Sequence, residues 1–318
     1  MNYLKVACTG ALLIGSLTIL SAEENNVPIG NVLGSTGNVF PEGKSRFVIK
    51  HVSVIKNNAY NGDDEVDDSL DRTMSVNQTN FLYRYGLGYG FDIRVIATYV
   101  QKSLNFTKMG TDIGLDNSGL GDSKIVSRYE LLNQKKGAPL FLTVGAGIKL
   151  PTGSTDKTFS TDLGDMGPSS TQTMQLGSGS YDFISEIGAT KILPNSRVDA
   201  HIMYTKTSEG DNDYQFGDTL QWNLGYSYAT SKTLDLQIEL DGLHTGKNQS
   251  GGVDVDNTGG NFVYITPGIH IIPRKKYDLS LGYAYMIHRD NNYNYNSTSN
   301  SGGVSEDYKF VVRAGYNF

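Results

Sequence analysis

The last stretch of the chain, EDYKFVVRAGYNF at residues 306–318, alternates two kinds of side chain and ends on an aromatic residue. One parity carries Tyr308, Phe310, Val312, Ala314, Tyr316 and Phe318, and the other carries Lys309, Arg313 and Asn317 with Val311 and Gly315. A period of two predicts a β-strand with one apolar face and one polar face. Strands usually end in polar turn residues, so a water-soluble domain has little reason to stop on Phe318.

The start of the chain predicts export. Lys5 is followed by the mostly apolar run VACTGALLIGSLTIL and then by Ser21-Ala22 before EENN. This pattern is typical of a cleaved secretory signal peptide, and the run is too short to cross a bilayer as a helix. We therefore expect residues 1–22 to be removed. Cys8, the only cysteine, lies in this segment, so neither a disulfide nor a Cys-ligated metal is expected in the mature chain.

Composition favours one all-β unit. The chain of 318 residues contains 37 Gly and 20 Tyr along its whole length, with no helical period beyond the signal and no Pro/Ser linker. The formal net charge is −6 and becomes about −7 when Lys5 leaves. A nucleic-acid partner would need a basic footprint and is not expected. No further apolar run reaches the ~18 residues of a membrane helix, which leaves a periplasmic protein, a secreted protein or an outer-membrane barrel.

The alternation recurs along the chain, for example in TLDLQIELDG at residues 233–242 and LFLTVGAGIKL at residues 140–150. About twelve strands are predicted, near residues 44–57, 73–86, 90–104, 120–133, 139–150, 177–193, 196–208, 218–229, 233–245, 260–272, 277–290 and 306–318. Each has the ~9–11 residues that a tilted strand needs to cross a bilayer.

The connections decide between a sandwich and a barrel. Short turns such as LPNS and TSKT alternate with long polar loops such as NAYNGDDEVDDSLD. Outer-membrane barrels show this asymmetry, whereas Greek-key sandwiches do not. We predict an all-β fold, a single transmembrane antiparallel β-barrel of about 12 strands, over residues 44–318. Residues 23–43 are expected to form an N-terminal segment in the periplasm or in the lumen.

Three stretches together resemble a known family: GLGDSKIVSRYELL (119–132), GAGIKLPTGS (145–154) and LGSGSYDF (176–183). In order and spacing they are similar to the family called MetA-pathway of phenol degradation, whose members are described as outer-membrane transport proteins. The resemblance extends over about residues 40–318. It implies a barrel and the uptake of small aromatic compounds. The terminal Phe318 likewise resembles the C-terminal signature that barrel-assembly machinery recognises.

The polar parity of the strands supplies candidate residues for a lumen lining. They are Arg94, Asp122, Lys124, Arg128, Glu130, Lys149, Glu186, Arg197, Asp199, Asp235, Glu239 and Arg313. These side chains can line a selective pore, or opposite charges can neutralise one another and plug it. Barrels of eight strands are filled by side chains and barrels of sixteen hold a wide channel, so twelve strands leave both alternatives open.

The longest loop, residues 151–175, supplies a second set of candidates. It carries Phe159, Leu163, Met166 and Met174, which a fully solvated loop has little reason to contain. Burying apolar surface is favourable by ~25 cal/mol per Å², and the barrel mouth is the nearest place to bury it. We expect the loop to fold inward and constrict the lumen; the alternative is an external loop without that role.

No catalytic, metal or cofactor motif stands out. The five histidines fall on different strands, and no His–Ser run matches the outer-membrane phospholipase pattern, so the chain is not expected to be an enzyme. The acidic segments DDEVDD (63–68) and GGVDVDNTGG (251–260) lack the spacing of an EF-hand and are interpreted as solvated loops. Calcium at these loops, or divalent ions shared with lipopolysaccharide, is the alternative.

Together these features predict a protein of the bacterial outer membrane. We expect a passive uptake channel for small molecules, with aromatic or hydrophobic ones favoured. The alternative is a non-transporting structural or adhesive protein that acts through its external loops. The expected partners are outer-membrane lipid and lipopolysaccharide, the barrel-assembly machinery and a small-molecule substrate.

Overall fold

The computed structural model of the chain describes residues 27–256, 258–274, 276–291 and 303–318. The predicted signal peptide lies outside these residues. The main strands are β1 (Ser45–Asn61), β3 (Thr73–Gly88), β4 (Phe91–Lys108), β6 (Ser123–Leu132), β7 (Phe141–Leu150), β10 (Asp182–Ile192), β11 (Ser196–Lys206), β13 (Thr219–Ala229), β14 (Leu234–Thr245), β17 (Gly260–Arg274), β18 (Tyr277–Asn291) and β19 (Gly303–Asn317).

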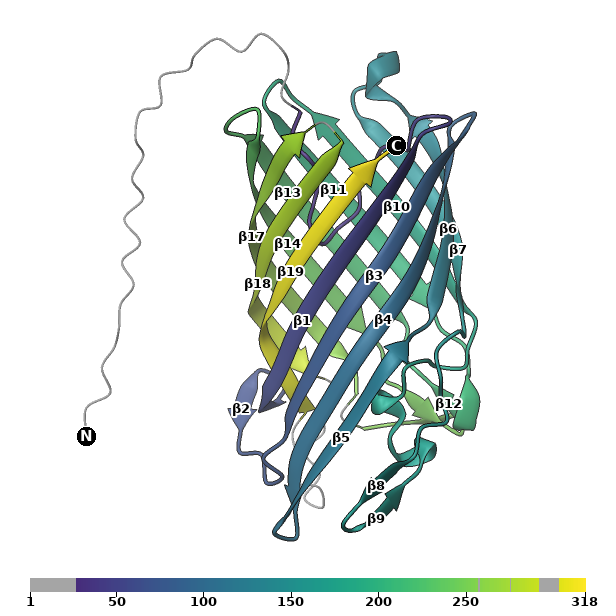
Figure 1. The fold of residues 1–318 in the computed structure, drawn as a ribbon, viewed down its shortest axis with the longest axis vertical. Helices are drawn as coiled ribbons and strands as arrows, with labels where there is room; N and C mark the ends of the chain where they lie inside the picture. Colours follow the sequence, from purple (N-terminus) through teal and green to yellow (C-terminus); the bar gives the residue numbers. More distant parts are fainter. Residues whose placement is uncertain (1–26, 257, 275, 292–302) are drawn as a thin grey trace, which may run out of the picture.

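These strands form one closed antiparallel barrel, in which each strand pairs with the next in this order (Figure 1). The barrel closes because β19 also pairs with β1, in a register that runs from Arg46 opposite Asn317 to Tyr60 opposite Gly303. The predicted all-β barrel of about twelve strands is therefore confirmed. No helical turn in the described part of the chain is long or apolar enough to span a membrane.

The barrel is apolar outside and polar inside, the reverse of a water-soluble domain. On β14, Leu236 and Ile238 are 48% and 46% exposed, whereas their neighbours Asp235 and Glu239 are 2% and 1% exposed. Side chains alternate between the two faces of a strand. The hydrophobic parity seen in the sequence is thus the outer, lipid-facing surface, as in membrane barrels.

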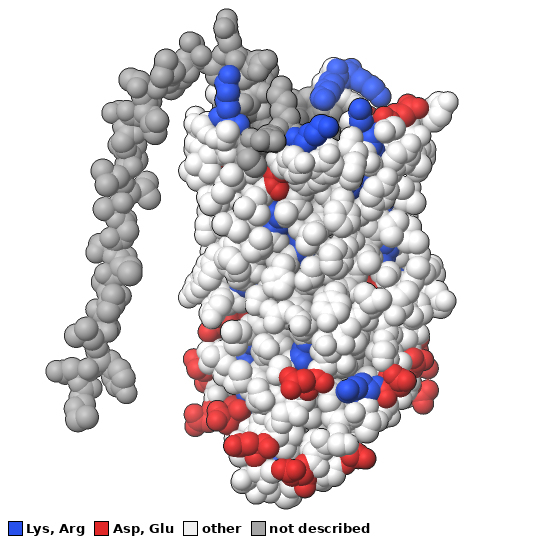
Figure 2. Space-filling model, in the orientation of Figure 1, with Lys and Arg blue, Asp and Glu red and all other residues white. Residues whose placement is uncertain are grey.

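The two ends of the barrel carry opposite charges. Lys and Arg side chains collect at the end where the chain terminates, and Asp and Glu side chains collect at the end with the long loops (Figure 2). Both termini of an even-stranded barrel lie at the end with short turns, which is the periplasmic end in outer-membrane barrels. The acidic end with the long loops therefore faces outward.

Several boundaries differ from those expected. Residues 105–119, predicted to be a loop, belong mostly to strands, because β4 continues to Lys108 and pairs with the additional strand β5 (Thr111–Leu120). Met109 and Gly110 form the tight turn, both with positive φ (53° and 76°). Residues 177–181 were predicted to be strand, but β10 begins only at Asp182.

The additional strand has a physical explanation. The first part of β4, from Phe91 to Ile96, pairs with β6, and its second part, from Tyr99 to Lys108, pairs with β5. The wall therefore continues outward beyond the part of the barrel that spans the membrane. There the apolar parity changes sides: Leu104 and Phe106 of β4 and Ile113 and Leu115 of β5 pack inward under the loop 151–175, so the pattern of a lipid-facing strand is interrupted.

Short elements fold the external loops. They are β2 (Asp64–Val66), β8 (Phe159–Thr161), β9 (Gly164–Met166), β12 (Tyr214–Gln215), β15 (Gln249–Ser250) and β16 (Val253–Asp254), with the 3-10 turns η2 (Pro168–Ser170), η3 (Gln172–Met174) and η4 (Asp211–Asp213). At the periplasmic end η1 (Gln134–Lys136) joins β6 to β7.

Candidate functional site: a plugged lumen

Residues 27–42, which we call the plug, lie inside the barrel before β1 begins (Figure 1). The carboxylate of Glu239 accepts the backbone N–H groups of residues 32–34, with Leu33 and Gly34 at 3.3 and 3.2 Å. On the same face of β14, nearer its start, Asp235 accepts the backbone N–H of Ile29 at 2.9 Å. Two carboxylates of β14 thus satisfy four backbone donors that would otherwise be buried without partners.

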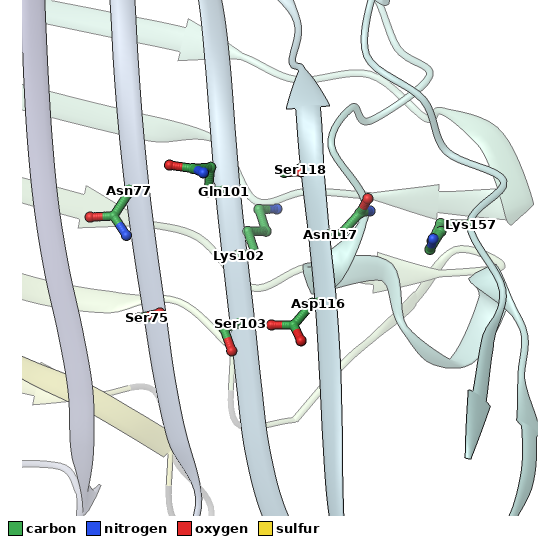
Figure 3. A pocket seen from close by; sticks show the side chains of 9 residues that line it. All are labelled: Ser75, Asn77, Gln101, Lys102, Ser103, Asp116, Asn117, Ser118 and Lys157. Atoms are coloured by element: carbon green, nitrogen blue, oxygen red, sulfur yellow. The ribbon is translucent and has the colours of Figure 1, made fainter.

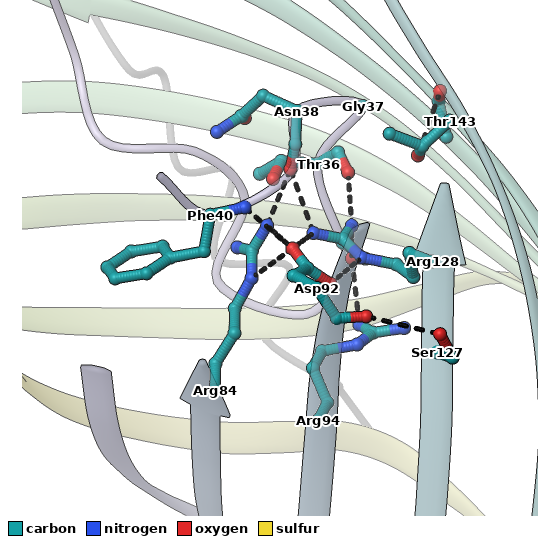
Figure 4. A network of polar contacts seen from close by, with 12 residues as sticks. Thr36, Gly37, Asn38, Phe40, Arg84, Asp92, Arg94, Ser127, Arg128 and Thr143 are labelled. Carbon is teal, nitrogen blue, oxygen red and sulfur yellow. Dashed lines mark hydrogen bonds and ion pairs between the residues drawn. The ribbon is translucent and has the colours of Figure 1, made fainter. Parts of the chain in front are cut away.

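The other side of the lumen holds the plug with guanidinium groups. Arg84 and Arg128 donate to the carbonyl oxygen of Asn38 at 2.6 and 2.8 Å. Both also bind Asp92, at 2.6 and 2.9 Å, and Asp92 accepts the backbone N–H of Phe40 at 2.7 Å. This network joins β3, β4 and β6 to the end of the plug (Figure 4).

Further ion pairs extend the network around the wall. Glu186 on β10 pairs with Arg94 and lies 3.4 Å from Nε2 of His201. Arg197 pairs with Asp199 at 2.6 Å. All five side chains are buried, and buried charges are retained only when they are paired and hydrogen-bonded. The polar lumen is therefore a neutralised network rather than a row of free charges.

The wall leaves room for the plug at glycines. A Cβ on Gly225 would lie 1.9 Å from the side-chain oxygen of Asn31, and one on Gly188 would lie 3.0 Å from the carbonyl oxygen of Thr36. Any side chain at Gly225 would therefore collide with the plug. The wall and the plug fit one another at these positions.

The three family-like stretches meet at the external side of the lumen. Nζ of Lys149 lies 3.0 Å from Asp122, 2.7 Å from Asp182 and 3.1 Å from Ser180, and it donates to Ser178. Asp122 precedes β6, Lys149 lies on β7, and the other three residues lie at or just before β10. Residues separated by about sixty positions in the sequence form one buried ionic cluster.

The loop 151–175 is folded onto the inner face of the external wall. Phe159 and Met174 are 6% and 1% exposed and pack with Ile113 and Leu115 of β5. Met166 packs against the same cluster, whereas Leu163 is 46% exposed and lies outside it.

A polar hollow of about 420 Å³ lies on the external extension of the wall (Figure 3). It is lined by side chains of β3, β4 and β5, among them Ser75, Asn77, Gln101, Ser103, Asp116 and Ser118. Lys102 ties the loop to this wall by donating to the carbonyl oxygens of Thr173 and Gln175 at 2.8 and 2.6 Å.

The remaining predicted residues lie at different heights of the barrel. Lys124 is half-buried opposite Lys149. Glu130 lies at the periplasmic end and accepts from Asn133 at 2.7 Å. Arg313 donates to the carbonyl oxygens of residues 30 and 31 of the plug.

Sequence reasoning missed Arg84 and Lys50, which also hold the plug: Lys50 donates to the carbonyl oxygen of Leu33 at 3.4 Å. Arg84 could have been found, because it lies on the parity opposite Phe81 and Tyr83. Among the described residues, no three His, Cys, Asp or Glu side chains are grouped so as to hold a metal ion.

Comparison with known proteins agrees with this architecture. A family model described as "Putative MetA-pathway of phenol degradation" matches residues 56–299. No curated protein matches the chain.

A solved outer-membrane channel shares the fold of the barrel. The crystal structure of the COG4313 outer membrane channel from Pseudomonas putida F1 is similar with a TM-score of 0.64 at 16% identity, over 89% of this chain and 98% of that chain. The β domain of the Bordetella autotransporter BrkA is less similar, with a TM-score of 0.44 at 12% identity, over 86% of this chain and 99% of that one. The apolar outer face, the closed barrel and the shared fold place the protein in the bacterial outer membrane.

Proposed function

The chain belongs to the MetA-pathway of phenol degradation family, and from this premise we propose that it is a passive uptake channel for small molecules. Aromatic or otherwise hydrophobic compounds are its favoured cargo. The observation that supports this most is the way the lumen is filled: a hydrogen-bonded chain segment, rather than inward side chains alone, occupies it. Such a segment can shift without breaking the barrel wall.

The charges around the plug support a role in selection. Guanidinium groups come from β3, β4, β6, β11 and β19, and those of the first four strands are paired with carboxylates, whereas Asp235, Glu239 and Asp241 lie together on β14 and bind the plug or neutral side chains. A solute that passes beside the plug crosses the field between these two sides, where a low local dielectric strengthens electrostatic interactions. The twelve lumen residues predicted from the sequence are proposed to act in this way. Six of them do so through the plug that they hold: Arg94, Arg128, Arg197, Asp235, Glu239 and Arg313.

The loop 151–175 is proposed to narrow the external mouth. Phe159, Met166 and Met174 contribute apolar surface on the inner side of the β5 wall. Phe159 and Met174 are buried and anchor the loop, so a hydrophobic solute would meet the loop through the partly buried Met166. Leu163 is 46% exposed and is not part of this cluster, so it does not anchor the loop.

Enzymatic activity is not part of the proposal. His270 and Ser280 are hydrogen-bonded at 2.7 Å, but both are fully buried, so a substrate cannot reach them. The nearby guanidinium of Arg313 and the amide of Gln237 complete their hydrogen bonds. We interpret the His270–Ser280 hydrogen bond as a structural contact between the strands β17 and β18.

The rival function is a non-transporting wall or adhesive protein. The plug and the folded external loops favour it, because a permanently filled lumen conducts nothing and ordered loops can bind. Lipid is the surrounding medium in either case. Lipopolysaccharide at the acidic external rim and assembly machinery at Phe318 are proposed partners in both functions.

Planar-bilayer conductance and liposome swelling separate the two functions. The full chain should give small conductance and slow flux of phenol-sized solutes. Deletion of residues 27–38, with the barrel verified by its mobility shift between unheated and heated gel samples, should raise both several-fold. A correctly folded deletion variant that passes no small solute would reject the channel.

A further inference from the structure

A cavity of about 520 Å³ lies at the periplasmic end of the barrel, beyond the plug. One wall is the end of the plug, residues 38–42, and the others are the β3–β4 turn at residues 88–90 and the η1 turn with its flanks. Small-molecule sites typically have volumes of about 300–1,000 Å³. The cavity has room for a single-ring compound.

Aromatic rings from four separate segments line this cavity: Phe40, Tyr89, Phe91, Tyr129 and Phe141. Phe91 and Tyr129, 43% and 40% exposed on the outer parity, lie 4.6 Å apart at a tilt of 41° and form the rim of the cavity. The side chain of Phe40 points away from Asp92, and its ring lies 5.2 Å from the guanidinium carbon of Arg84 (Figure 4). Aromatic pairs in tilted or offset geometry contribute ~0.5–1.5 kcal/mol beyond burial, so rings placed around a cavity favour a ring as its occupant.

The charges at the cavity leave one cation unused. Arg197 is paired with Asp199 at 2.6 Å, and Lys136 lies 3.6 Å from Glu130. Lys135 of the η1 turn lines the cavity and forms no ion pair within the described residues; the other unpaired charge, the carboxylate of Glu42, lies against Gly88 at the β3–β4 turn. An anionic group on the occupant would find its partner there.

We propose that this cavity binds a small aromatic anion, a single ring that carries a carboxylate or a phenolate. The ring lies between Phe40 and the Phe91–Tyr129 edge, and the anionic group faces Lys135. The inference deepens the proposed uptake function, on which it rests for its physiological meaning: the cavity is the last binding position before release into the periplasm.

Binding can be measured without transport. Benzoate is titrated into the purified full-length mature protein in detergent and followed by ligand-detected saturation-transfer NMR. Saturable binding is expected, about tenfold weaker in F40A and severalfold weaker in K135Q. In K135Q the affinity should also lose its dependence on salt, because an exposed ion pair is screened by salt. F81A, on the outer wall of β3, is the matched control and should bind as the wild type does.

Ring and charge are tested separately. Cyclohexanecarboxylate keeps the charge without the aromatic ring, and benzyl alcohol keeps the ring without the charge; both should bind more weakly than benzoate. The inference is overturned if benzoate does not saturate, if cyclohexanecarboxylate binds equally well, or if F40A and K135Q bind as the wild type does. Binding without flux would reject the channel alone, and flux without binding would reject the cavity site alone.

Discussion

At the scale of single residues, a few buried carboxylates determine where the plug lies. Glu239 is 1% exposed and accepts three consecutive backbone N–H groups. It is also next to Asp241, which shares its face of β14. Two like charges this close are tolerated because the plug, Gln237 and Thr266 donate to them. The plug therefore stabilises the wall as much as the wall stabilises the plug.

Replacing Glu239 should release the plug. Hydrogen bonds to a charged group contribute about 1.5–3 kcal/mol, and each 1.4 kcal/mol is a factor of ten. E239A should therefore raise plug opening about ten- to hundredfold, and E239Q, which keeps an acceptor, should raise it less. The readouts are bilayer conductance and maleimide labelling of S35C in the plug. D165A, an exposed external carboxylate, is the control; unchanged labelling in E239A would contradict the role of Glu239.

A second residue-scale prediction concerns the external loop between β11 and β13. Burial opposes ionisation of Asp218, but hydrogen bonds from Lys206, Thr207 and Tyr204 outweigh it and lower the pKa to about 2. Because this folded-state pKa is lower than the unfolded one, near 3.9, the stabilisation is present above pH 4. It is lost as the pH falls through 2.

Hydrogen–deuterium exchange of residues 205–218, corrected for the intrinsic pH dependence, should accelerate between pH 4 and pH 2. D218N should exchange faster than the wild type at pH 4 and show no further change as the pH falls. A wild-type loop whose corrected exchange is flat over this range would show that Asp218 does not anchor it.

At the scale of elements, the external loop 151–175 is held by a small apolar core of its own. Its members come from β5, from the loop and from the inner face of β4, and Met174 is the most deeply buried of the loop residues. The sequence predicted that the loop's apolar residues would be buried, but not which ones. Leu163 and Met166 are three positions apart and equally apolar, and only contact with the unrecognised strand β5 separates their roles.

A charge at Met174 should detach the loop, because large core residues replaced by small ones already cost about 2–5 kcal/mol and an unpaired buried charge costs more. M174D should make the loop sensitive to external protease and increase solute flux. L163D is the matched control: its side chain is exposed, so neither readout should change. Equal protease sensitivity of the two variants would remove the apolar core as the anchor.

At the scale of the whole molecule, the fold could be predicted because lipid imposes the alternation. Wherever a strand crosses the membrane, an apolar residue such as Leu236 of β14 identifies the outer face and a polar one such as Asp235 identifies the inner face. Where β4 and β5 project beyond the membrane, the apolar side chains, such as Leu104 and Ile113, face inward instead of outward, and the prediction of a loop there was wrong. The site could be predicted only in part. Residues on the polar parity point inward, but the pairing of Glu239 with residues 32–34 spans about two hundred positions and leaves no periodic signal.

The last prediction concerns how the barrel closes. The backbone N–H of Phe318 donates to Ser45 at 2.9 Å, and its ring makes a T-shaped contact with Tyr316 at 4.5 Å. The side chain is nevertheless 61% exposed, so its removal costs little folding free energy, within about 0.5 kcal/mol as for other surface substitutions. If Phe318 is a recognition signal, its effect belongs to assembly and not to stability.

F318S should therefore lower the amount of barrel in the outer-membrane fraction several-fold. The same variant refolded in detergent should keep the wild-type urea midpoint and the wild-type gel mobility shift. V311D, at a fully buried position of β19 on the closing seam, should instead lower both the amount and the urea midpoint. Wild-type abundance of F318S in the outer membrane would exclude the signal. A lowered urea midpoint in F318S would make Phe318 a structural residue of the β1–β19 seam, because a residue that acts only during assembly leaves the stability of the finished barrel unchanged.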